Sequence, residues 1–544
     1  MANLLYLFII IISFPLCSSL EHHSHLIKHG LFEQKYLEIT RPLPFANFTP
    51  SCTLPILTHD FGNTMGLPPI SVAYAPPENC SWNYVALQFN ASSKGLQYDR
   101  IAAVWLDGAD IFRTSTPEST ENGVFWTVTK DVTRYSSLLL KEDISLSVML
   151  ENLVNEVYTG LYHVDITFLY YDIDNIMNNV PLSNRKVRLL HEKTAHLIVP
   201  ISGNGGEGFW FRIQSDSEFQ GKSVILPNNT YKAVMEICVS FHGHDEFWYS
   251  NPPDNYIQAN NLTSQRGHGA YREVLLNIDE NLVGSVVPFP VIYPGGMNPL
   301  YWDPVVVNSL PFWLVDANLH LWVDKQCTHD CLVQAETLDY GTPEFELERS
   351  SSFEGLDGSF EIEMTRKSQY RGWVNSSAGN LTTTVSRELK FKNKIKFDEN
   401  GNEKKIKQKV KEEREIRVES EMGIKIYHNT VKRKYPLTIT TKTEPSRKDG
   451  ANLMRSELEN EWSEKKKWSD GDDDSSSSSL NNGQKCKGWM VVQDNVVLQG
   501  GAETEQSYSY NGEASSYSRE IRAANGMLIN DTANYLKFAS FSAM

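Results

Sequence analysis

An acid beside a base at the start of an apolar run is the feature of this sequence best suited to chemistry. Asp99 and Arg100 immediately precede the run IAAVWL of residues 101–106. Partly buried charges must be paired or hydrogen-bonded, so this segment is expected to hold a polar partner or ligand beside Asp99 and Arg100. A carboxylate can exchange protons with a reacting group, and a guanidinium offers a fixed fork of donors. The alternative is a structural ion pair at a strand edge.

The elements that hold this pair are predicted to be strands. Apolar runs of period two, rich in Val, Ile, Tyr and Phe, alternate with turn clusters of Gly, Pro, Asn and Asp. The clearest runs are 84–90, 144–150, 162–171, 231–241 and 320–324. Short strands at this spacing are typical of β-sandwiches, so the fold class is expected to be all-β.

Four blocks of the sequence resemble the plant peptide-N-glycosidase A family of glycoamidases, which cut N-linked glycans from asparagine. The blocks are residues 105–118, 123–139, 242–256 and 294–304, and the resemblance covers nearly the whole mature chain. The first half is also similar to the bacterial peptide:N-glycosidase F through YDRIAAVWL, DVTRYSSLL, SLSVMLENL and HGHDEFW, in that order. Because the bacterial enzyme has two jelly rolls, the resemblance implies two jelly-roll β-sandwiches packed side by side, followed here by a C-terminal β-rich domain.

The resemblance also implies three catalytic acids, namely Asp99 in YDR, Glu151 in VMLEN and Glu246 in HDEFW. Asp99 would be the principal catalytic residue, with Arg100 holding the sugar or the peptide. Glu151 and Glu246 would position water or sugar hydroxyls, and the alternative for each is an ordinary loop carboxylate. Two of these acids come from the first jelly roll and one from the second, so the site is expected at the joint.

Carboxyl groups suffice for this reaction. Hydrolysis of the amide needs water oriented at the side-chain carbonyl and a proton for the departing glycosylamine nitrogen, and carboxyls with separated pKa values can provide both. We therefore expect no metal and no cofactor. The expected substrates are N-glycosylated peptides or unfolded glycoproteins.

Sugar stacking must come from residues other than those of the bacterial enzyme, because a tryptophan there is matched here by Leu153. Trp302, Trp248 and Phe241 are candidates, since aromatic faces offer flat apolar area to a pyranose ring. Each of them is individually more often a core residue than a platform. His244, in the block that holds Glu246, is a further candidate for substrate binding.

Two other functions compete with the amidase reading. A lectin-like binding protein would use its acids only to hydrogen-bond sugars. A copper monooxygenase would also use paired jelly rolls, and His242 and His244 have the H-x-H form of a copper ligand pair. The monooxygenase would need a further clustered histidine and a methionine ligand, and no such cluster is visible in the sequence.

Residues 1–19 are expected to be a secretory signal peptide, because the short apolar run 3–16 is followed by small residues. The alternative is a signal anchor. About 525 residues remain, which at roughly 150 per domain suggests three units. We expect the first jelly roll at 20–180, the second at 181–337 and the C-terminal domain at 338–544.

The C-terminal region combines two kinds of sequence. Residues 388–397 and 404–419 alternate apolar and charged side chains around a DENGN turn, which predicts a long exposed hairpin. Residues 444–488 are rich in Ser, Asp, Glu, Lys, Asn and Gly, which predicts a disordered insertion prone to proteolysis. Cleavage there would leave two chains.

Charge, cysteines and sequons agree with a secreted protein. The chain has 67 acidic and 51 basic side chains and a net charge of -16, which argues against nucleic acid as a partner. Of seven cysteines, six remain as disulfide candidates once Cys17 is set aside, namely Cys52, Cys80, Cys238, Cys327, Cys331 and Cys486. The sequence shows a sequon at each of eight asparagines, Asn47, Asn79, Asn90, Asn228, Asn261, Asn375, Asn380 and Asn530.

Localisation follows from these features. We expect the secretory pathway, ending in the extracellular space (the apoplast) or the vacuole. No membrane association is expected after removal of the signal peptide.

Overall fold

The fold is dominated by β-strands in a computed structural model that describes residues 4–11, 34–35, 42–43, 48–97, 99–117, 119, 121–178, 194–203, 208–263, 266–290, 313–326, 333–339, 341, 343–448, 450–471, 475–493, 496–513, 515–525 and 527–537. The helices within these ranges are short: α1 (Ser136–Leu139), α2 (Ile173–Asn178), α3 (Asp254–Ala259) and the 3-10 turns η1 (Thr133–Tyr135), η3 (Gly243–Asp245) and η4 (Trp248–Ser250). None of the described helices has the length and apolar character needed to cross a bilayer. The all-β prediction is confirmed.

The first unit is a sandwich of two sheets. One sheet has the order β2 (Gln34–Lys35), β8 (Val124–Asp131), β5 (Tyr84–Lys94), β10 (Leu161–Tyr171), β3 (Cys52–Phe61). The other has the order β4 (Ile70–Tyr74), β9 (Ile144–Leu150), β6 (Ile101–Leu106), β7 (Ala109–Ser115). All pairings are antiparallel except that of β2 with β8. Side chains that alternate towards the interior, such as the stacked Phe89 and Phe112, form one core between the sheets.

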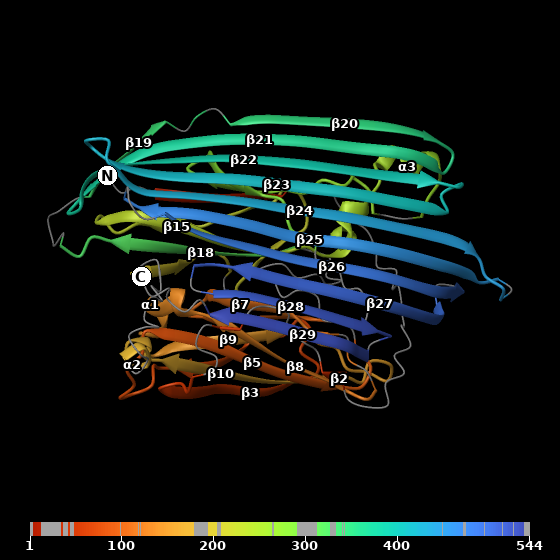
Figure 1. Ribbon diagram of the computed structural model, residues 1–544, viewed down its shortest axis with the longest axis horizontal. Helices are drawn as coiled ribbons and strands as arrows, with labels where there is room; N and C mark the ends of the chain where they lie inside the picture. The colour runs from red at the N-terminus through yellow and green to blue at the C-terminus, as the bar shows by residue number, and fades with distance from the viewer. Residues whose placement is uncertain are drawn as a thin grey trace, which may run out of the picture.

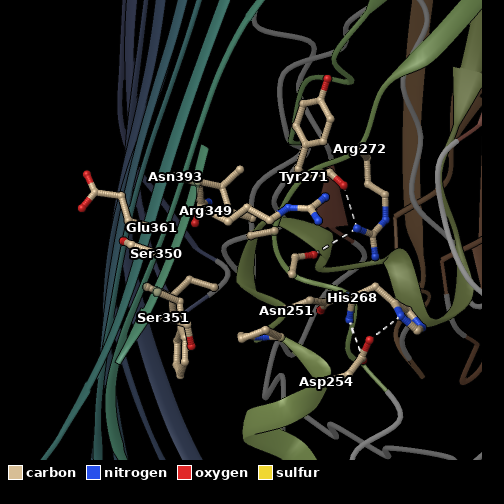
Figure 2. Close-up of a pocket in the computed structure, with 16 residues that line it drawn as sticks. Asn251, Asp254, His268, Tyr271, Arg272, Arg349, Ser350, Ser351, Glu361 and Asn393 are labelled. Carbon is tan, nitrogen blue, oxygen red and sulfur yellow. Dashed lines mark hydrogen bonds and ion pairs between the residues drawn. The ribbon is translucent and has the colours of Figure 1, made fainter. Parts of the chain in front are cut away.

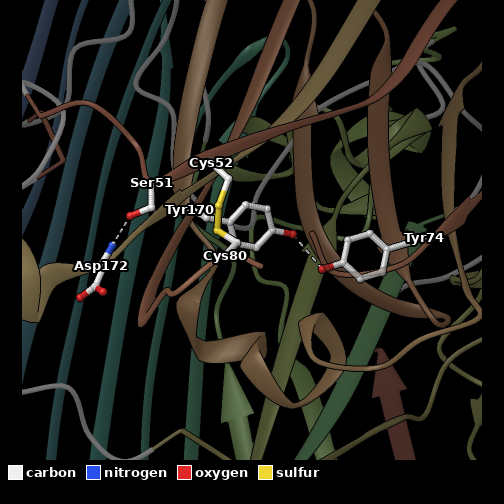
Figure 3. The surroundings of a disulfide bond; sticks show 6 residues. All are labelled: Ser51, Cys52, Tyr74, Cys80, Tyr170 and Asp172. Atoms are coloured by element: carbon white, nitrogen blue, oxygen red, sulfur yellow. Dashed lines mark hydrogen bonds between the residues drawn. A yellow bond between two sulfur atoms is a disulfide. The ribbon is translucent and has the colours of Figure 1, made fainter. Parts of the chain in front are cut away.

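A disulfide ties these two sheets together, as Figure 3 shows. Cys52 begins β3 and Cys80 follows β4, and their Cα atoms lie 6.3 Å apart. The hydroxyls of Tyr74 and Tyr170 share a hydrogen bond of 2.8 Å beside it. Two of the six predicted disulfide candidates, Cys52 and Cys80, therefore do form a bridge.

The other cysteine candidates divide into two groups. Cys238 on β15 and Cys486 on β26 are thiols, so the prediction that they form disulfides is wrong. Each lies within a paired strand whose neighbouring positions hold no cysteine, as with Asp316 opposite Cys238. Cys327 and Cys331 lie outside the described residues.

The second unit also has two sheets around a shared core. One contains β11 (Leu197–Pro200), β18 (Trp313–Val323), β12 (Phe211–Ile213) and β15 (Thr230–Ser240). The other contains β1 (Leu4–Ile11), β13 (Phe219–Gln220), β14 (Ser223–Ile225), β16 (Val274–Ile278) and β17 (Asn281–Val286). Leu276 of β16 packs with Leu319 and Leu321 of β18 between them. Strand β1 falls within the predicted signal peptide, which stays a prediction.

A single eleven-stranded antiparallel sheet forms the C-terminal unit, seen in Figure 1 as the long green-to-blue strands. Its strands are β19 (Gln334–Asp339), β20 (Glu344–Glu354), β21 (Asp357–Ser376), β22 (Gly379–Asp398), β23 (Glu403–Ser420), β24 (Lys425–Pro445), β25 (Asn452–Asp470), β26 (Ser475–Gln493), β27 (Val496–Asn511), β28 (Ser515–Ala524) and β29 (Met527–Lys537). From β21 to β29 each strand pairs with the next along the chain, and β19 and β20 both pair with β21. The hairpin predicted around the DENGN turn is confirmed, with Asp398 opposite Glu403.

The disorder predicted for 444–488 is corrected by the structure. Residues 452–470 and 475–493 form strands β25 and β26, which pair with each other along their length. Their polar composition suits strands whose two faces are largely solvated, because the backbone hydrogen bonds are supplied by neighbouring strands. Composition alone did not reveal those partners.

The second sandwich packs against the C-terminal sheet. Trp248 is fully buried and its ring lies 6.1 Å from that of Phe391 on β22. Arg366 on β21 donates from Nε and Nη2 to the two carboxylate oxygens of Glu273, each at 2.8 Å. Apolar contact and a bidentate ion pair thus fix the sheet to this unit.

Candidate active site

Strand register brings Asp99 and Glu151 to one edge of a sheet. Strands β6 and β9 are antiparallel with Ala102 opposite Leu150, so β6 begins where β9 ends. Asp99 precedes β6 and Glu151 follows β9. The pairing of β6 with β7 continues past the strand end, because the N–H of Thr116 donates to the carbonyl of residue 100 at 2.7 Å. Two acids predicted to act together therefore lie at neighbouring positions.

Both acids are placed on the sheet face that meets the second sandwich. Side chains two residues apart in extended chain share a face, so Asp99 follows the face of Ile101 and Glu151 that of Met149. Ile101 and Met149 belong to a buried cluster that includes Leu314 of β18. The edge of the first sandwich is thus turned towards the second.

A cation from the second sandwich faces Glu151. The Nη2 atom of Arg212, on β12, lies 3.8 Å from Oε1 of Glu151, and the same oxygen accepts a hydrogen bond of 3.2 Å from the N–H of Gly66. The Glu151 side chain is 10% exposed and that of Arg212 is 26% exposed. The pair can therefore reach a ligand at the joint while remaining mostly out of water.

Arg100 does not take the role predicted for it. Its side chain is buried, and Nη2 donates to Oε1 of Gln97 at 2.7 Å. Gln97 in turn donates to the carbonyls of Leu153 (2.8 Å) and Gly160 (3.2 Å). Arg100 therefore braces the chain segments that carry Asp99 and Glu151, and alternation puts its side chain on the opposite face of the strand from Asp99.

A buried ionic network holds the two sandwiches in register beside this edge. Arg113 on β7 is fully buried and forms ion pairs with Asp110 and with Asp316 of β18. It also donates to the Oγ of Ser240 at 3.0 Å and to the carbonyl of Leu314 at 3.1 Å. These acids hold the pKa of Arg113 above its usual value although burial opposes them.

Glu246 forms a cluster with Arg266 and Phe247 in the second sandwich. It follows η3, and its Oε2 lies 3.6 Å from Nη2 of Arg266, whose guanidinium also stacks 5.0 Å from the ring centre of Phe247. Burial raises the pKa of Glu246, and Arg266 opposes this only in part. Within the described residues, no ion pair or hydrogen bond joins Glu246 to Asp99 or Glu151.

The C-terminal sheet contributes to the same cluster. Lys404 of β23 lies over the ring of Phe397 at 5.5 Å, and burial together with the charge of Arg266 lowers its pKa to about 8. The environment of Glu246 is therefore built from two units of the chain.

Two of the predicted sugar platforms are core residues. Trp248 and Phe241 are both fully buried and pack edge-to-face at 6.4 Å, and Phe241 also contacts Trp313. The prediction that they stack on sugar is wrong, because their faces are covered by neighbouring apolar side chains. Trp302 lies outside the described residues. Phe247, which is 37% exposed and backed by Arg266, is an accessible aromatic side chain in this loop.

The histidines of the H-x-H motif differ in environment. His242 is buried at 2% exposure, whereas His244 is exposed and Gly243 between them has a φ of +64°. Of the two imidazoles, only that of His244 is therefore open to solvent. No group of three His, Cys, Asp or Glu residues able to hold a metal occurs in the ranges that the structure describes.

The sequons lie mostly at the surface. Asn79, Asn228, Asn261, Asn375 and Asn530 are exposed, as a glycan requires. Asn90 and Asn380 are partly buried within or beside strands, and Asn47 lies outside the described residues.

Arg212, Arg266 and Phe247 are the functional candidates that the sequence did not single out. The two arginines sit in segments without a motif, and their roles depend on contacts made across units. Phe247 lies inside the HGHDEFW block, so its position next to Glu246 was the available signal.

The chain is similar to known proteins over most of its length. Residues 41–310 match the family described as peptide N-acetyl-beta-D-glucosaminyl asparaginase amidase A. The chain is similar to the peptide-N4-(N-acetyl-beta-glucosaminyl)asparagine amidase A of Prunus dulcis, with 34% identity over 534 residues that cover 91% of this chain and 92% of that protein. No solved structure matches the chain.

Proposed function

Since the chain belongs to the peptide-N-glycosidase A family, it is an amidase that releases N-linked glycans from glycopeptides, and we propose that it does so where β6 and β9 meet β12. The observation that carries this placement is the approach of Arg212 to Glu151 across the two sandwiches. With Asp99 at the neighbouring position, two acids and one cation converge at the joint. Sites between units of this kind are common places for small-molecule chemistry.

The reaction assigns complementary tasks to these groups. A water molecule attacks the carbonyl carbon of the asparagine side chain, the new C–O bond forms, and the C–N bond to the glycosylamine breaks. One proton of the water passes to a carboxylate, which we assign to Asp99, and the leaving nitrogen receives a proton in exchange. The products are a peptide with aspartate and a glycosylamine.

Glu151 positions the attacking water or a sugar hydroxyl, and Arg212 stabilises the charge that develops in the reaction. Glu151, held by Gly66 and Arg212, can orient the attacking water or a sugar hydroxyl. The Arg212 guanidinium can stabilise negative charge that develops on the carbonyl oxygen, an effect that is strong in a site shielded from water. Glu246, with its raised pKa, suits the group that delivers the proton to nitrogen.

The test is release of glycan from a denatured glycopeptide, followed by mass spectrometry of the peptide. Asp99→Asn keeps the shape of the side chain but removes its charge, so we expect a loss of about 10²-fold or more in kcat with folding unchanged. Glu142→Gln is the matched control, because Glu142 is exposed just before β9, far along the strand from Glu151. Near-normal turnover by Asp99→Asn would overturn the placement.

Three finer features are part of the same proposal. We infer that the two sandwiches are jelly rolls, as in the bacterial glycoamidase that the first half resembles. We also infer that the protein enters the secretory pathway, because the five exposed sequons and the Cys52–Cys80 bridge suit that route. The substrates are then glycopeptides or unfolded glycoproteins.

A further inference from the structure

A cavity lies between the second sandwich and the C-terminal sheet, and neither Asp99 nor Glu151 belongs to its lining. Its volume is about 230 Å³, and residues of the 251–272 segment face strands β20, β21 and β22 across it (Figure 2). Phe360, Ile362 and Ile395 supply apolar surface. The two units that form it are held together by the Arg366–Glu273 ion pair, so the cavity is part of a fixed interface.

Arg272, in one wall, has a hydrogen-bond donor that no described residue accepts. The residue is 1% exposed. Its Nη1 donates to the carbonyls of Gly269 (3.0 Å) and Tyr271 (2.7 Å), and its Nη2 pairs with Asp245 at 2.6 Å. The Nε atom is buried and has no hydrogen-bond partner among the described residues. A buried donor left unsatisfied costs about 1–3 kcal/mol, so a group that accepts from it would be favoured.

Asn251, in the same lining, presents the complementary acceptor. It is 2% exposed, and its Nδ2 donates to the carbonyl of His244 at 3.2 Å. Its Oδ1 is buried and has no partner in the described part of the chain. The lining therefore includes one residue with a donor and one with an acceptor that no described residue satisfies.

Arg349 adds a guanidinium that can meet a ligand. Figure 2 shows it extending from β20 towards Tyr271 and Arg272. The residue is exposed, and its side chain forms no ion pair or hydrogen bond with any described residue. Its donor fork can therefore bind the oxygens of a ligand without breaking an internal contact.

We propose that this cavity binds a single neutral pyranose unit of the substrate's glycan, at a distance from the bond that is cut. A pyranose has hydroxyls that donate and accept, which matches Arg272 Nε, Asn251 Oδ1 and Arg349, and an apolar face, which matches Phe360. A simple carboxylate only accepts and would leave Asn251 unsatisfied. The volume is below the roughly 300–1,000 Å³ typical of pockets for drug-sized ligands, so one ring fits better than an oligosaccharide. The proposal rests on the proposed function only for the source of the sugar.

Binding is tested with free mannose as the probe, measured by calorimetry on the full-length protein. Arg349→Ala should weaken mannose binding about 10-fold or more, because a hydrogen bond from a charged donor is lost. Arg371→Ala is the matched control, since Arg371 is also exposed and lies on the adjacent strand β21. Thermal melting of both variants checks that they fold. Equal affinity in Arg349→Ala and wild type, or tighter binding of propionate than of mannose, would overturn the proposal.

A second measurement separates this site from the catalytic one. The ratio of kcat/KM for a glycopeptide with a branched glycan to that for one with a single N-acetylglucosamine should fall in Arg349→Ala and stay constant in Arg371→Ala. Glycan release without mannose binding would remove the cavity site and leave the proposed function standing. Mannose binding that depends on Arg349, without glycan release, would support the cavity site and overturn the proposed function.

Discussion

At the scale of single residues, two of the three candidate acids, Glu151 and Glu246, lie in different surroundings. Glu151 is held in place by the N–H of Gly66 and faces Arg212. Glu246 is buried enough that its pKa is raised, so it keeps a proton at higher pH than an ordinary glutamic acid. Acids whose environments differ in this way can act as base and acid in one reaction.

Glu246→Gln should change both the rate and the pH profile of kcat/KM. If Glu246 donates the proton, wild-type activity declines as pH rises through its raised pKa, and the variant lacks this decline because glutamine does not titrate. The rate should fall about 10²-fold or more. A pH–rate profile of both enzymes measures the two effects.

Stability supplies the check on that result. A carboxyl whose folded pKa is above its unfolded value weakens the fold as pH rises through that range, so Glu246→Gln should not lower the Tm at neutral pH. Glu142→Gln should alter neither rate, profile nor Tm. An unaltered rate and profile in Glu246→Gln would remove Glu246 from the chemistry.

The sequence predicted the candidate residues that lie in recognisable motifs. It missed those whose proposed roles depend on contacts between units of the chain. Asp99 and Glu151 were found from short blocks, and the register of β6 and β9 explains why they meet. Arg100 was assigned to substrate although it braces Gln97, because one residue's shift along a strand reverses the face. Arg212 could not be found, since its role depends on a pairing between units.

At the scale of elements, Arg113 joins three strands. It lies on β7, pairs with Asp316 of β18 and donates to Ser240 at the end of β15. The indole N–H of Trp105 on β6 also donates to Asp316, at 3.4 Å. The sheet edge that carries Asp99 and Glu151 is therefore fixed by a network in which each buried charge depends on the others.

Arg113→Met should destabilise the protein by about 3–5 kcal/mol, because removing one member of a buried ionic group leaves the other charges uncompensated. The measurement is urea unfolding at neutral pH. Adding Asp110→Asn and Asp316→Asn to Arg113→Met removes the stranded charges and should recover part of the loss. A single variant as stable as wild type would show that the network does not hold the sandwiches together.

Strand patterning was predictable where one face of a strand is buried, as in β5 and β10, whose alternation was visible in the sequence. The prediction from the sequence failed for residues 444–488, where the polar strands β25 and β26 have few buried side chains. In such strands the partner sets the structure, and the sequence does not show the partner.

At the scale of the whole molecule, the contacts between units are charged as well as apolar. Glu236 of β15 accepts hydrogen bonds from Arg134 (2.7 Å) and Tyr135 (2.9 Å) of the first sandwich. It also contacts His320 of its own sandwich at 3.0 Å. Burial alone would raise the pKa of Glu236, but the hydrogen bond with His320 and the nearby cations outweigh burial and hold it well below the usual range.

Glu236 should therefore make the joint between the sandwiches sensitive to acid. Because its folded pKa is below the unfolded value of about 4.3, its contribution is complete above that value and is lost as pH falls through the folded pKa. Glu236→Gln should lower stability by about 1–3 kcal/mol at pH 7, since hydrogen bonds to a charged group are weakened. The difference between wild type and variant should then narrow as the pH is lowered below about 4. Urea midpoints across this range measure it, with exposed Glu280→Gln as the control. A difference that stayed constant down to the lowest pH would mean that the charge of Glu236 does not link the two sandwiches, and that the Arg113 network and apolar contacts hold the site at their joint without it.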